Sequence, residues 1–305
     1  MEFLYLLESI RFPGLNEFML TVTRLGEETA FLVIALIVFW CIDKYKGYYI
    51  LSVGFIGTLA NQFLKLWYRI PRPWVIDENF TILEAAREAA AGYSFPSGHT
   101  QSAVGTFGAI AYTAKNRKVK VLFVVAAVLV AFSRMYIGVH TPLDVFVSVA
   151  VAVVLIVALK ALVLDNFKSC FRYVFAIMVL MSVLFLVFVE CYHFPVDIDA
   201  HNLASGLQNA YTLFGCLVGL LVVYIIDERW LNFSTTAVWW AQIIKVAGGL
   251  SLVLAVKAGL KAPLNILLGE SIGRSIRYML VVIVAGVLWP LSFKYFKRFG
   301  AKDQP

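Results

Sequence analysis

The sequence predicts an all-α, polytopic membrane protein, a helical bundle of about nine transmembrane helices, and three observations support this. Of its 305 residues, 61% are hydrophobic and 15% are charged. The mean hydropathy is +0.82. The apolar residues also form long runs that end at short charged segments, such as residues 43–46. A water-soluble domain of this length could not bury so much apolar surface, so we expect an integral membrane protein.

Residues 1–26 precede the first long apolar run. Apolar positions such as Leu15, Phe18, Met19 and Val22 recur at helical spacing, which favours a short interfacial helix. The expected spans then follow at about residues 28–42, 47–66, 97–114, 121–138, 142–164, 173–191, 203–226, 236–256 and 277–293. Residues 75–95 form a polar loop in which we expect a short helix at residues 82–91.

The distribution of basic residues predicts the orientation in the membrane. The loops after odd-numbered spans and the tail carry most of the loop lysines and arginines, among them those at residues 115–120 and 294–302. Because cytoplasmic loops are enriched in such residues, we expect a cytoplasmic C-terminus and an external N-terminus. This also accounts for the net charge of +7 without a nucleic-acid partner. Four basic residues do not follow the rule, since they fall on the external side: Lys257, Lys261, Arg274 and Arg277.

A turn before the third span combines features of an anion site. Pro96 and Ser97 are typical of a helix start, and Gly98 lets a ligand approach the backbone closely. His99 is the next residue after Gly98. Helix N-termini carry unpaired N–H groups and a partial positive charge, which suit a bound phosphate.

Further polar side chains fall at the external ends of neighbouring spans. They are Lys65 and Arg72 at the end of the second span, and Ser133, Arg134, His140 and Asp144 around the short turn between the fourth and fifth spans. Charged residues near or within a bilayer are costly and usually serve a site. Three fixed positive charges facing two histidines and one aspartate fit a phosphate dianion. We therefore predict that these stretches meet in one external cup.

The two histidines differ in their surroundings. Asp144 lies four residues after His140, in the first turn of a helix that Thr141 and Pro142 should open. A carboxylate there can hold one imidazole nitrogen as N–H and leave the other as a nucleophile. His99 has no carboxylate at that spacing, so it is better placed as the acid that protonates a leaving oxygen.

These residues form three motifs: Lys65-x6-Arg72-Pro73, Pro96-Ser97-Gly98-His99 and Ser133-Arg134-x5-His140-x3-Asp144. Together they resemble the signature of the type 2 phosphatidic acid phosphatase family, whose superfamily also contains vanadium haloperoxidases and glucose-6-phosphatases. The resemblance covers about residues 45–165. It implies a metal-independent phosphohydrolase with His140 as nucleophile, Asp144 as its orienting group and His99 as general acid. The phosphate would bind to Lys65, Arg72, Ser97, Gly98 and Arg134, with Ser133 as a weaker member.

The resemblance also predicts a domain organisation. We expect an N-terminal interfacial segment at residues 1–26, a six-helix membrane phosphatase core at 27–191, and three additional spans with a basic tail at 192–305. Nine spans are similar to the glucose-6-phosphatases only in topology.

Several functions remain open from the sequence. The first is a phosphatase of lipid phosphates or lipid pyrophosphates, such as undecaprenyl pyrophosphate, phosphatidylglycerophosphate or phosphatidate, in a bacterial plasma membrane. The alternatives are hydrolysis of a soluble sugar phosphate and phosphotransfer to another lipid. A transporter or receptor would leave the nucleophile, acid and orienting group unexplained. The expected partners are lipid substrates and membrane lipids, and the sequence predicts no oligomeric state.

No cofactor or metal is expected. The four cysteines lack metal-type spacing, and the acidic loop with Glu190, His193, Asp197, Asp199 and His201 is spaced too loosely. Lys245 is an anomaly inside the eighth span. It would pair with a carboxylate, reach toward the interface, or line a path for the substrate headgroup.

Overall fold

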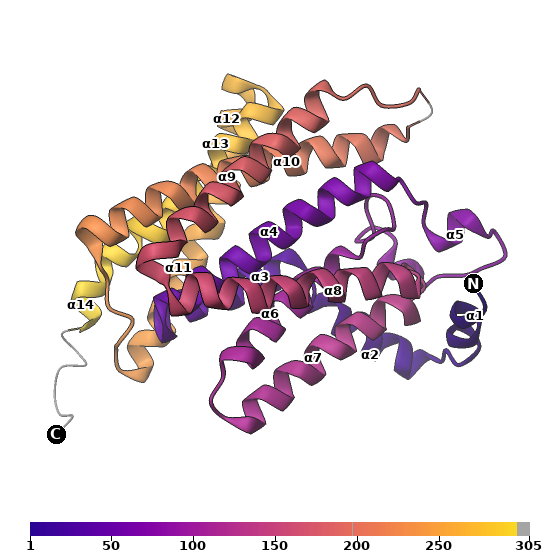
Figure 1. Ribbon diagram of the computed structural model, residues 1–305, viewed down its shortest axis with the longest axis horizontal. Coiled ribbons are helices and arrows are strands. Elements are labelled where there is room, and N and C mark those ends of the chain that lie inside the picture. Colours follow the sequence, from indigo (N-terminus) through magenta and orange to yellow (C-terminus); the bar gives the residue numbers. More distant parts are fainter. Residues whose placement is uncertain (197, 298–305) are drawn as a thin grey trace. The chain divides into compact units, whose positions relative to one another are not determined.

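The computed structural model describes residues 1–196 and 198–297, and its regular structure in these ranges is helical (Figure 1). The chain divides into two compact units. Unit 1 comprises Met1–Leu32, Tyr49–Asn166 and His193–Gly206, and unit 2 comprises Val33–Tyr48, Phe167–Tyr192 and Leu207–Pro305. Asp197 of the acidic loop and Arg298 and Lys302 of the basic tail lie outside the described residues.

The expected spans correspond to helices of the structure. Among the described residues, seven helices are long and apolar enough to cross a membrane. They run over Lys44–Ile76, Arg117–Tyr136, Pro142–Asp165, Ser169–Cys191, Ala200–Leu231, Trp239–Leu268 and Glu270–Phe296. A bent pair, Pro13–Arg24 with Glu28–Ile42, makes an eighth candidate, and the expected third span is the 16-residue helix Gly98–Thr113. An all-helical membrane bundle with about nine spans is therefore confirmed.

Unit 1 contains the helices that surround the predicted site. Wholly within it lie α1 (Glu2–Ser9), α2 (Pro13–Arg24), α5 (Pro73–Ile76), α6 (Gly98–Thr113), α7 (Arg117–Tyr136) and α8 (Pro142–Leu159). Helices α3 (Glu28–Ile37), α4 (Lys44–Tyr68) and α10 (Ala200–Ile226) have residues in both units. In Figure 1, α6, α7 and α8 lie side by side, and α2 packs against α7.

Local signals explain where these helices begin. Ser97 caps α6 by accepting a hydrogen bond from the Thr100 N–H, and Asn116 caps α7 in the same way through Lys118. At the start of α8, Thr141 and Asp144 form a reciprocal capping box, and Pro142 occupies the first helical turn. Each arrangement satisfies N–H groups that a helix start leaves unpaired.

The N-terminal segment differs from the expectation. It forms two helices, α1 and α2, and α2 meets the next helix at a bend of 54°. The predicted helix at residues 82–91 is wrong, because only Glu84–Ala86 form a 3₁₀ turn. The Leu83 N–H bonds to the Ile137 carbonyl, and Ala86 and Ala90 pack in the buried cluster around Tyr136. These contacts with the turn after α7 override the helical pattern.

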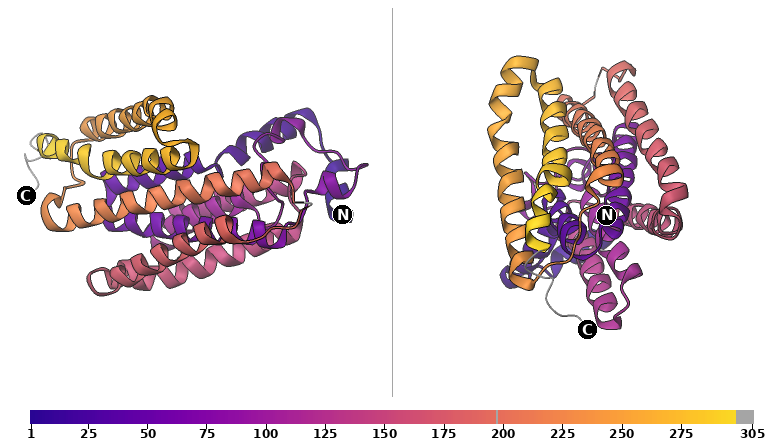
Figure 2. Two further views of the ribbon diagram at one scale, coloured as in Figure 1. Left: turned by 90° about the horizontal axis from the view of Figure 1, so that it is seen from above. Right: turned by 90° about the vertical axis from the view of Figure 1, so that its left-hand side faces the viewer.

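Unit 2 is a second helical body. Its own helices are α9 (Phe167–Cys191), α11 (Trp239–Gly259), α12 (Lys261–Leu268), α13 (Glu270–Ile283) and α14 (Phe293–Lys297). Helices α11, α12 and α13 form a hairpin, drawn in orange and yellow in Figure 2. The buried Trp40 donates its indole N–H to the Ala285 carbonyl at 2.9 Å. Phe39, Phe233 and Phe293 form an edge-to-face aromatic chain beside it.

Lys245 belongs to this aromatic region of unit 2. It is fully buried, its ammonium lies 4.3 Å from the centre of the Phe293 ring, and it donates to the Thr235 carbonyl at 3.2 Å. Backbone carbonyls and an aromatic face therefore take the place of the carboxylate that we considered as its partner. A role for Lys245 along a substrate path stays a prediction, as do the domain boundaries at residues 26 and 191.

Candidate active site

His140 lies in the turn between α7 and α8. Helix α7 ends at Tyr136, and Gly138 follows with φ of +88°, a conformation that favours glycine. A Cβ at Gly138 would also lie 2.9 Å from Nη2 of Arg11 and 3.0 Å from the Phe80 ring. Close packing is therefore a second reason for a glycine at this position. The turn brings His140 directly to the capped start of α8, where it is 1% exposed.

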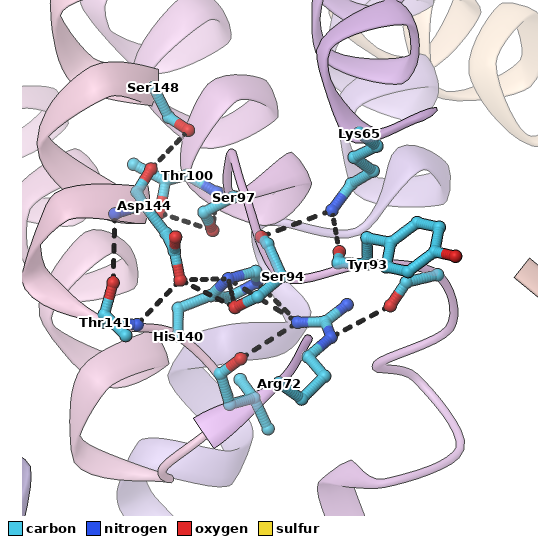
Figure 3. Close-up of polar contacts among 12 residues, drawn as sticks. Lys65, Arg72, Tyr93, Ser94, Ser97, Thr100, His140, Thr141, Asp144 and Ser148 are labelled. Atoms are coloured by element: carbon cyan, nitrogen blue, oxygen red, sulfur yellow. Dashed lines mark hydrogen bonds and ion pairs between the residues drawn. The ribbon is translucent and has the colours of Figure 1, made fainter. Parts of the chain in front are cut away.

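The Asp144 carboxylate is fixed beside this imidazole (Figure 3). Its Oδ2 accepts hydrogen bonds from the Ser94 hydroxyl at 2.6 Å and from the Thr141 N–H at 2.8 Å. His140 Nδ1 lies 3.5 Å from the same oxygen. The tautomer with its proton on Nδ1 directs that proton to Asp144 and leaves the Nε2 lone pair free for other chemistry.

Arg72 lies on the other side of the imidazole. Its Nη1 is 3.0 Å from His140 Nε2 and donates to the Val139 carbonyl at 2.9 Å. The remaining nitrogens bond to the carbonyls of Gly92 and Ala91. Figure 3 shows the guanidinium held between the loop and His140. The orientation of Arg72 is therefore set by backbone groups, with one edge directed at the imidazole.

Lys65 approaches from the last turns of α4. It is 7% exposed, and its ammonium donates to the Tyr93 carbonyl and, at 3.4 Å, to the Ser94 carbonyl. These bonds tie the loop that carries Ser94 to α4. A lysine in this position adds a fixed positive charge beside Arg72 without a carboxylate ion pair.

Arg134 and His99 carry polar atoms that have no hydrogen-bond partner among the described residues. Arg134 is 1% exposed and uses Nη1 for a 2.6 Å hydrogen bond to the Thr23 hydroxyl. Its Nε and Nη2 are buried without a hydrogen-bond partner, as is Nε2 of His99. Buried donors are normally satisfied, so unpaired ones next to the other cations indicate a site for an anionic group.

The start of α6 lies in the same region. The Ser97 N–H donates to the Asp144 carbonyl at 3.2 Å, which joins α6 to α8. The Ser97 hydroxyl oxygen accepts from Thr100, so its own hydrogen is free to donate. Gly98 faces Asn61, because a Cβ on Gly98 would lie 3.8 Å from the Asn61 side-chain oxygen. Both amide atoms of Asn61 are buried without a partner.

The electrostatic surroundings of His140 favour its neutral form. Burial lowers its pKa well below the ordinary value, and the charges of Arg72, Arg134 and Lys65 lower it further. His99 also lies close enough to contribute to this field. A neutral imidazole retains the lone pair that a nucleophile needs.

The structure thus brings together residues from all three sequence motifs. Lys65, Arg72, Ser97, Gly98, His99, Arg134, His140 and Asp144 all belong to unit 1. Ser133 is different, since its hydroxyl bonds to the Val130 carbonyl of its own helix. Sequence reasoning missed Ser94, Asn61 and Thr23. Ser94 directly precedes the Phe95-Pro96-Ser97 segment of the second motif. This position next to a motif is the local feature that could have identified it as a site residue.

Comparisons with known proteins identify the family of the chain. Residues 45–168 match the model of the PAP2 superfamily. The chain is also 33% identical over 164 residues to phosphatidylglycerophosphatase B of Bacillus subtilis (strain 168), covering 50% of this chain and 76% of that protein. The chain belongs to the PAP2 superfamily. Residues 211–302 match a second model of this superfamily, described as the transmembrane extension of a PAP2 superfamily phosphatase.

For other relatives, the match covers a smaller share of the relative's own length. Undecaprenyl-diphosphatase BcrC of Bacillus subtilis (strain 168) is 36% identical over 102 residues, which are 33% of this chain and 50% of that protein. Human sphingosine-1-phosphate phosphatase 2 is 27% identical over 184 residues, 57% of this chain and 43% of that protein. No solved structure matches the chain significantly. The PAP2 domain and its extension, together with the apolar helices, make this an integral membrane protein.

Within the described part of the chain, no group of three or more histidine, cysteine, aspartate or glutamate side chains is arranged to hold a metal ion.

Proposed function

We propose that this PAP2 protein is a membrane phosphatase that hydrolyses lipid phosphates or lipid pyrophosphates through a phosphohistidine at His140. The observation that carries this proposal is the position of the imidazole. Nδ1 lies 3.5 Å from Asp144, and Nε2 faces Arg72 at 3.0 Å. Asp144 orients the ring, and the reactive nitrogen points toward the group that would hold a phosphoryl oxygen.

The unpaired donors support a phosphate at this point. Arg134 offers Nε and Nη2, His99 offers Nε2, and the first turn of α6 offers backbone N–H groups. Lys65, Arg72 and Arg134 supply three positive charges against one carboxylate. A phosphoryl group with two negative charges would neutralise this excess, and a neutral substrate would leave it uncompensated.

In the first chemical step, His140 Nε2 attacks phosphorus. An N–P bond forms and the bond from phosphorus to the leaving oxygen breaks, while protonated His99 gives its proton to that oxygen. Arg72, Arg134 and the α6 N-terminus stabilise the negative charge on the oxygens that stay on phosphorus. Because Arg72 is bonded to Nε2 before the substrate binds, its guanidinium must turn to phosphoryl oxygens when the nucleophile attacks.

Water completes the cycle in the second step. His99, now neutral, accepts a proton from the water whose oxygen attacks phosphorus, and the N–P bond breaks. Inorganic phosphate leaves, and His140 returns with its proton on Nδ1 beside Asp144. The same histidine thus serves as acid in the first step and as base in the second.

The names of relatives and the position of the site at the ends of the spans support a lipid substrate. The relatives include proteins named undecaprenyl-diphosphatase, phosphatidylglycerophosphatase B and sphingosine-1-phosphate phosphatase 2. A lipid substrate keeps its tail in the bilayer and presents its phosphate to the ends of the spans. By the positive-inside argument, the site opens to the outer face of a bacterial plasma membrane and the C-terminus is cytoplasmic.

Phosphate release from the purified, detergent-solubilised protein tests this function. The panel contains undecaprenyl pyrophosphate, phosphatidylglycerophosphate, phosphatidate and glucose 6-phosphate, each with EDTA. We expect turnover of at least one lipid, little turnover of the sugar phosphate, and inhibition by vanadate. Turnover of the sugar phosphate alone would replace this substrate class, and formation of a new phosphorylated lipid would indicate phosphotransfer.

The intermediate is tested with variants of the two histidines. With a labelled substrate that has a good leaving group, His99→Asn should still transfer phosphate to the protein but hydrolyse it slowly, so label accumulates after an alkaline quench. His140→Asn should show neither label nor turnover. Ser148→Ala is the control, because its hydroxyl donates to the backbone carbonyl of Asp144 and not to the carboxylate that faces His140. Turnover by the His140 variant near the wild-type rate would rule out the phosphohistidine.

A further inference from the structure

Arg277 is a buried cation in the transmembrane extension. It lies two turns into α13, within unit 2, and is 4% exposed. Its Nε and Nη1 are buried without a hydrogen-bond partner. Within the described ranges, Arg277 belongs to none of the ion pairs. A guanidinium cannot lose its proton at physiological pH, so this charge requires an anion from outside the described protein groups.

A second cation lies close to Arg277. The Arg277 guanidinium carbon is 5.4 Å from the centre of the Tyr278 ring, and Lys257 Nζ is 5.7 Å from the same centre. Lys257 is near the end of α11, and Arg277 is in the first third of the Glu270–Phe296 span, so both belong to the same end of the helical hairpin. The shared ring keeps the two positive charges near each other without neutralising either.

The carboxylate at the start of α13 is already engaged. Glu270 pairs with Arg274 at 3.1 Å and accepts from Gln208 at 3.3 Å. Its side chain is 62% exposed. Lys261 adds a further positive charge at the start of α12. This end of the extension therefore holds an excess of positive charge around a buried guanidinium.

The surface of the same hairpin end is apolar. In α12, Ile266 is 81% and Leu267 is 76% exposed, and Ile272 of α13 is 52% exposed. Helices α12 and α13 are packed closely, since a Cβ on Gly273 would lie 2.6 Å from the Leu264 carbonyl oxygen. In a membrane hairpin, such side chains contact acyl chains. Cations beside an acyl-chain surface suit a ligand with a charged headgroup and an apolar tail.

We propose that Arg277 and Lys257 bind the phosphate group of an anionic phospholipid at this end of the extension. The lipid phosphate accepts hydrogen bonds from Nε and Nη1 of Arg277, and its charge neutralises both cations. Its acyl chains lie against Ile266, Leu267 and Ile272. The site uses no catalytic residue of unit 1, so it is a lipid site separate from the proposed hydrolysis.

The test measures thermal unfolding of the full-length protein in a neutral detergent, titrated with phosphatidylglycerol, phosphatidylcholine or inorganic phosphate. Phosphatidylglycerol should raise the unfolding midpoint, and phosphatidylcholine should not. In Arg277→Gln, the phosphatidylglycerol concentration that gives half of the maximal increase in the unfolding midpoint should be at least about tenfold higher than in the wild type. Lys257→Gln should weaken the response less.

The matched control is Lys294→Gln. Lys294 also lies beside a tyrosine ring, at 5.1 Å from that of Tyr295, but at the opposite end of the Glu270–Phe296 span. This variant removes the same charge and should respond to phosphatidylglycerol like the wild type. An unchanged response in both Arg277→Gln and Lys257→Gln would overturn the site. Equal stabilisation by inorganic phosphate would show a general anion site and overturn the lipid assignment.

If Arg277→Gln does not fold, native mass spectrometry of Lys257→Gln and Lys294→Gln tests the lipid site instead. The amount of phosphatidylglycerol that stays bound to the protein should fall in Lys257→Gln and not in Lys294→Gln. Equal retention in both would contradict the proposal.

Discussion

The Thr23 hydroxyl accepts a 2.6 Å hydrogen bond from Nη1 of Arg134, although the two residues are 111 positions apart in the chain. Thr23 lies in α2, before the stretch at residues 45–168 that matches the PAP2 superfamily. Both side chains are buried. The bond fixes one edge of the guanidinium and leaves Nε and Nη2 for a ligand. Helix α2 is therefore part of the wall of the candidate active site.

Thr23→Val should weaken phosphate binding while largely preserving the chemical step. Valine keeps the shape of the side chain but removes the acceptor that orients Arg134. Because a hydrogen bond to a charged group contributes roughly 1.5–3 kcal/mol, we expect KM and the inhibition constant of vanadate to rise about tenfold. Thr23→Ser retains the hydroxyl and should behave like the wild type. Unchanged vanadate inhibition in Thr23→Val would show that Arg134 is oriented without Thr23.

Gly26→Ala should lower kcat through His99. An alanine Cβ there would lie 2.9 Å from the His99 carbonyl oxygen and 2.7 Å from a Val130 methyl group. The backbone of His99 cannot yield as a flexible side chain would, so the imidazole must shift. We expect kcat to fall by about 10²-fold for poor leaving groups, the range attributed to a general acid, and less for good ones.

The control for this variant is Gly14→Ala in α2, where the nearest atom to the new Cβ is 3.5 Å away, in the Phe12 ring. It should leave both kcat and KM near their wild-type values. The same loss of kcat for good and poor leaving groups in Gly26→Ala would argue against an effect through the acid.

The parts of the site that could be predicted depend on local signals. Ser97 caps the helix that follows it, Thr141 and Pro142 begin the next, and the four-residue spacing of His140 and Asp144 places them in one turn. Such relationships need only the sequence and the geometry of a helix.

The bonds that the sequence could not predict join distant parts of the chain. Ser94 meets Asp144 across 50 residues, and Thr23 meets Arg134 across 111. A serine in a loop and a threonine in an amphipathic helix have no pattern that distinguishes them. The same limit applies to residues 82–91, where contacts with Ile137 replaced the expected helix. The 54° bend after α2 lies where Gly26 packs closely on His99, a contact between residues that are far apart in the sequence.

Asp144→Asn should retain the fold and lose the rate. Asparagine has nearly the same shape as aspartate, and its oxygen can still accept from the Thr141 N–H. The neutral amide accepts the Nδ1 proton more weakly than the carboxylate does, and it does not stabilise positive charge on the imidazole. We expect kcat to fall by at least about 10²-fold. The thermal unfolding midpoint and the vanadate inhibition constant should change little, and a large fall in the midpoint would indicate a mainly structural role.

In unit 2, a buried ion pair should govern stability. Lys44 Nζ lies 3.2 Å from Asp227 Oδ2, and their side chains are 8% and 0% exposed. Lys44 also donates to Asn232 at 2.8 Å. Lys44→Met leaves the carboxylate buried without its cation, so we expect a loss of about 3–5 kcal/mol, measured by chemical unfolding in detergent. The double variant Lys44→Met/Asp227→Leu removes both charges and should recover part of that loss. Losses that simply add in the double variant would show that the pair is not coupled.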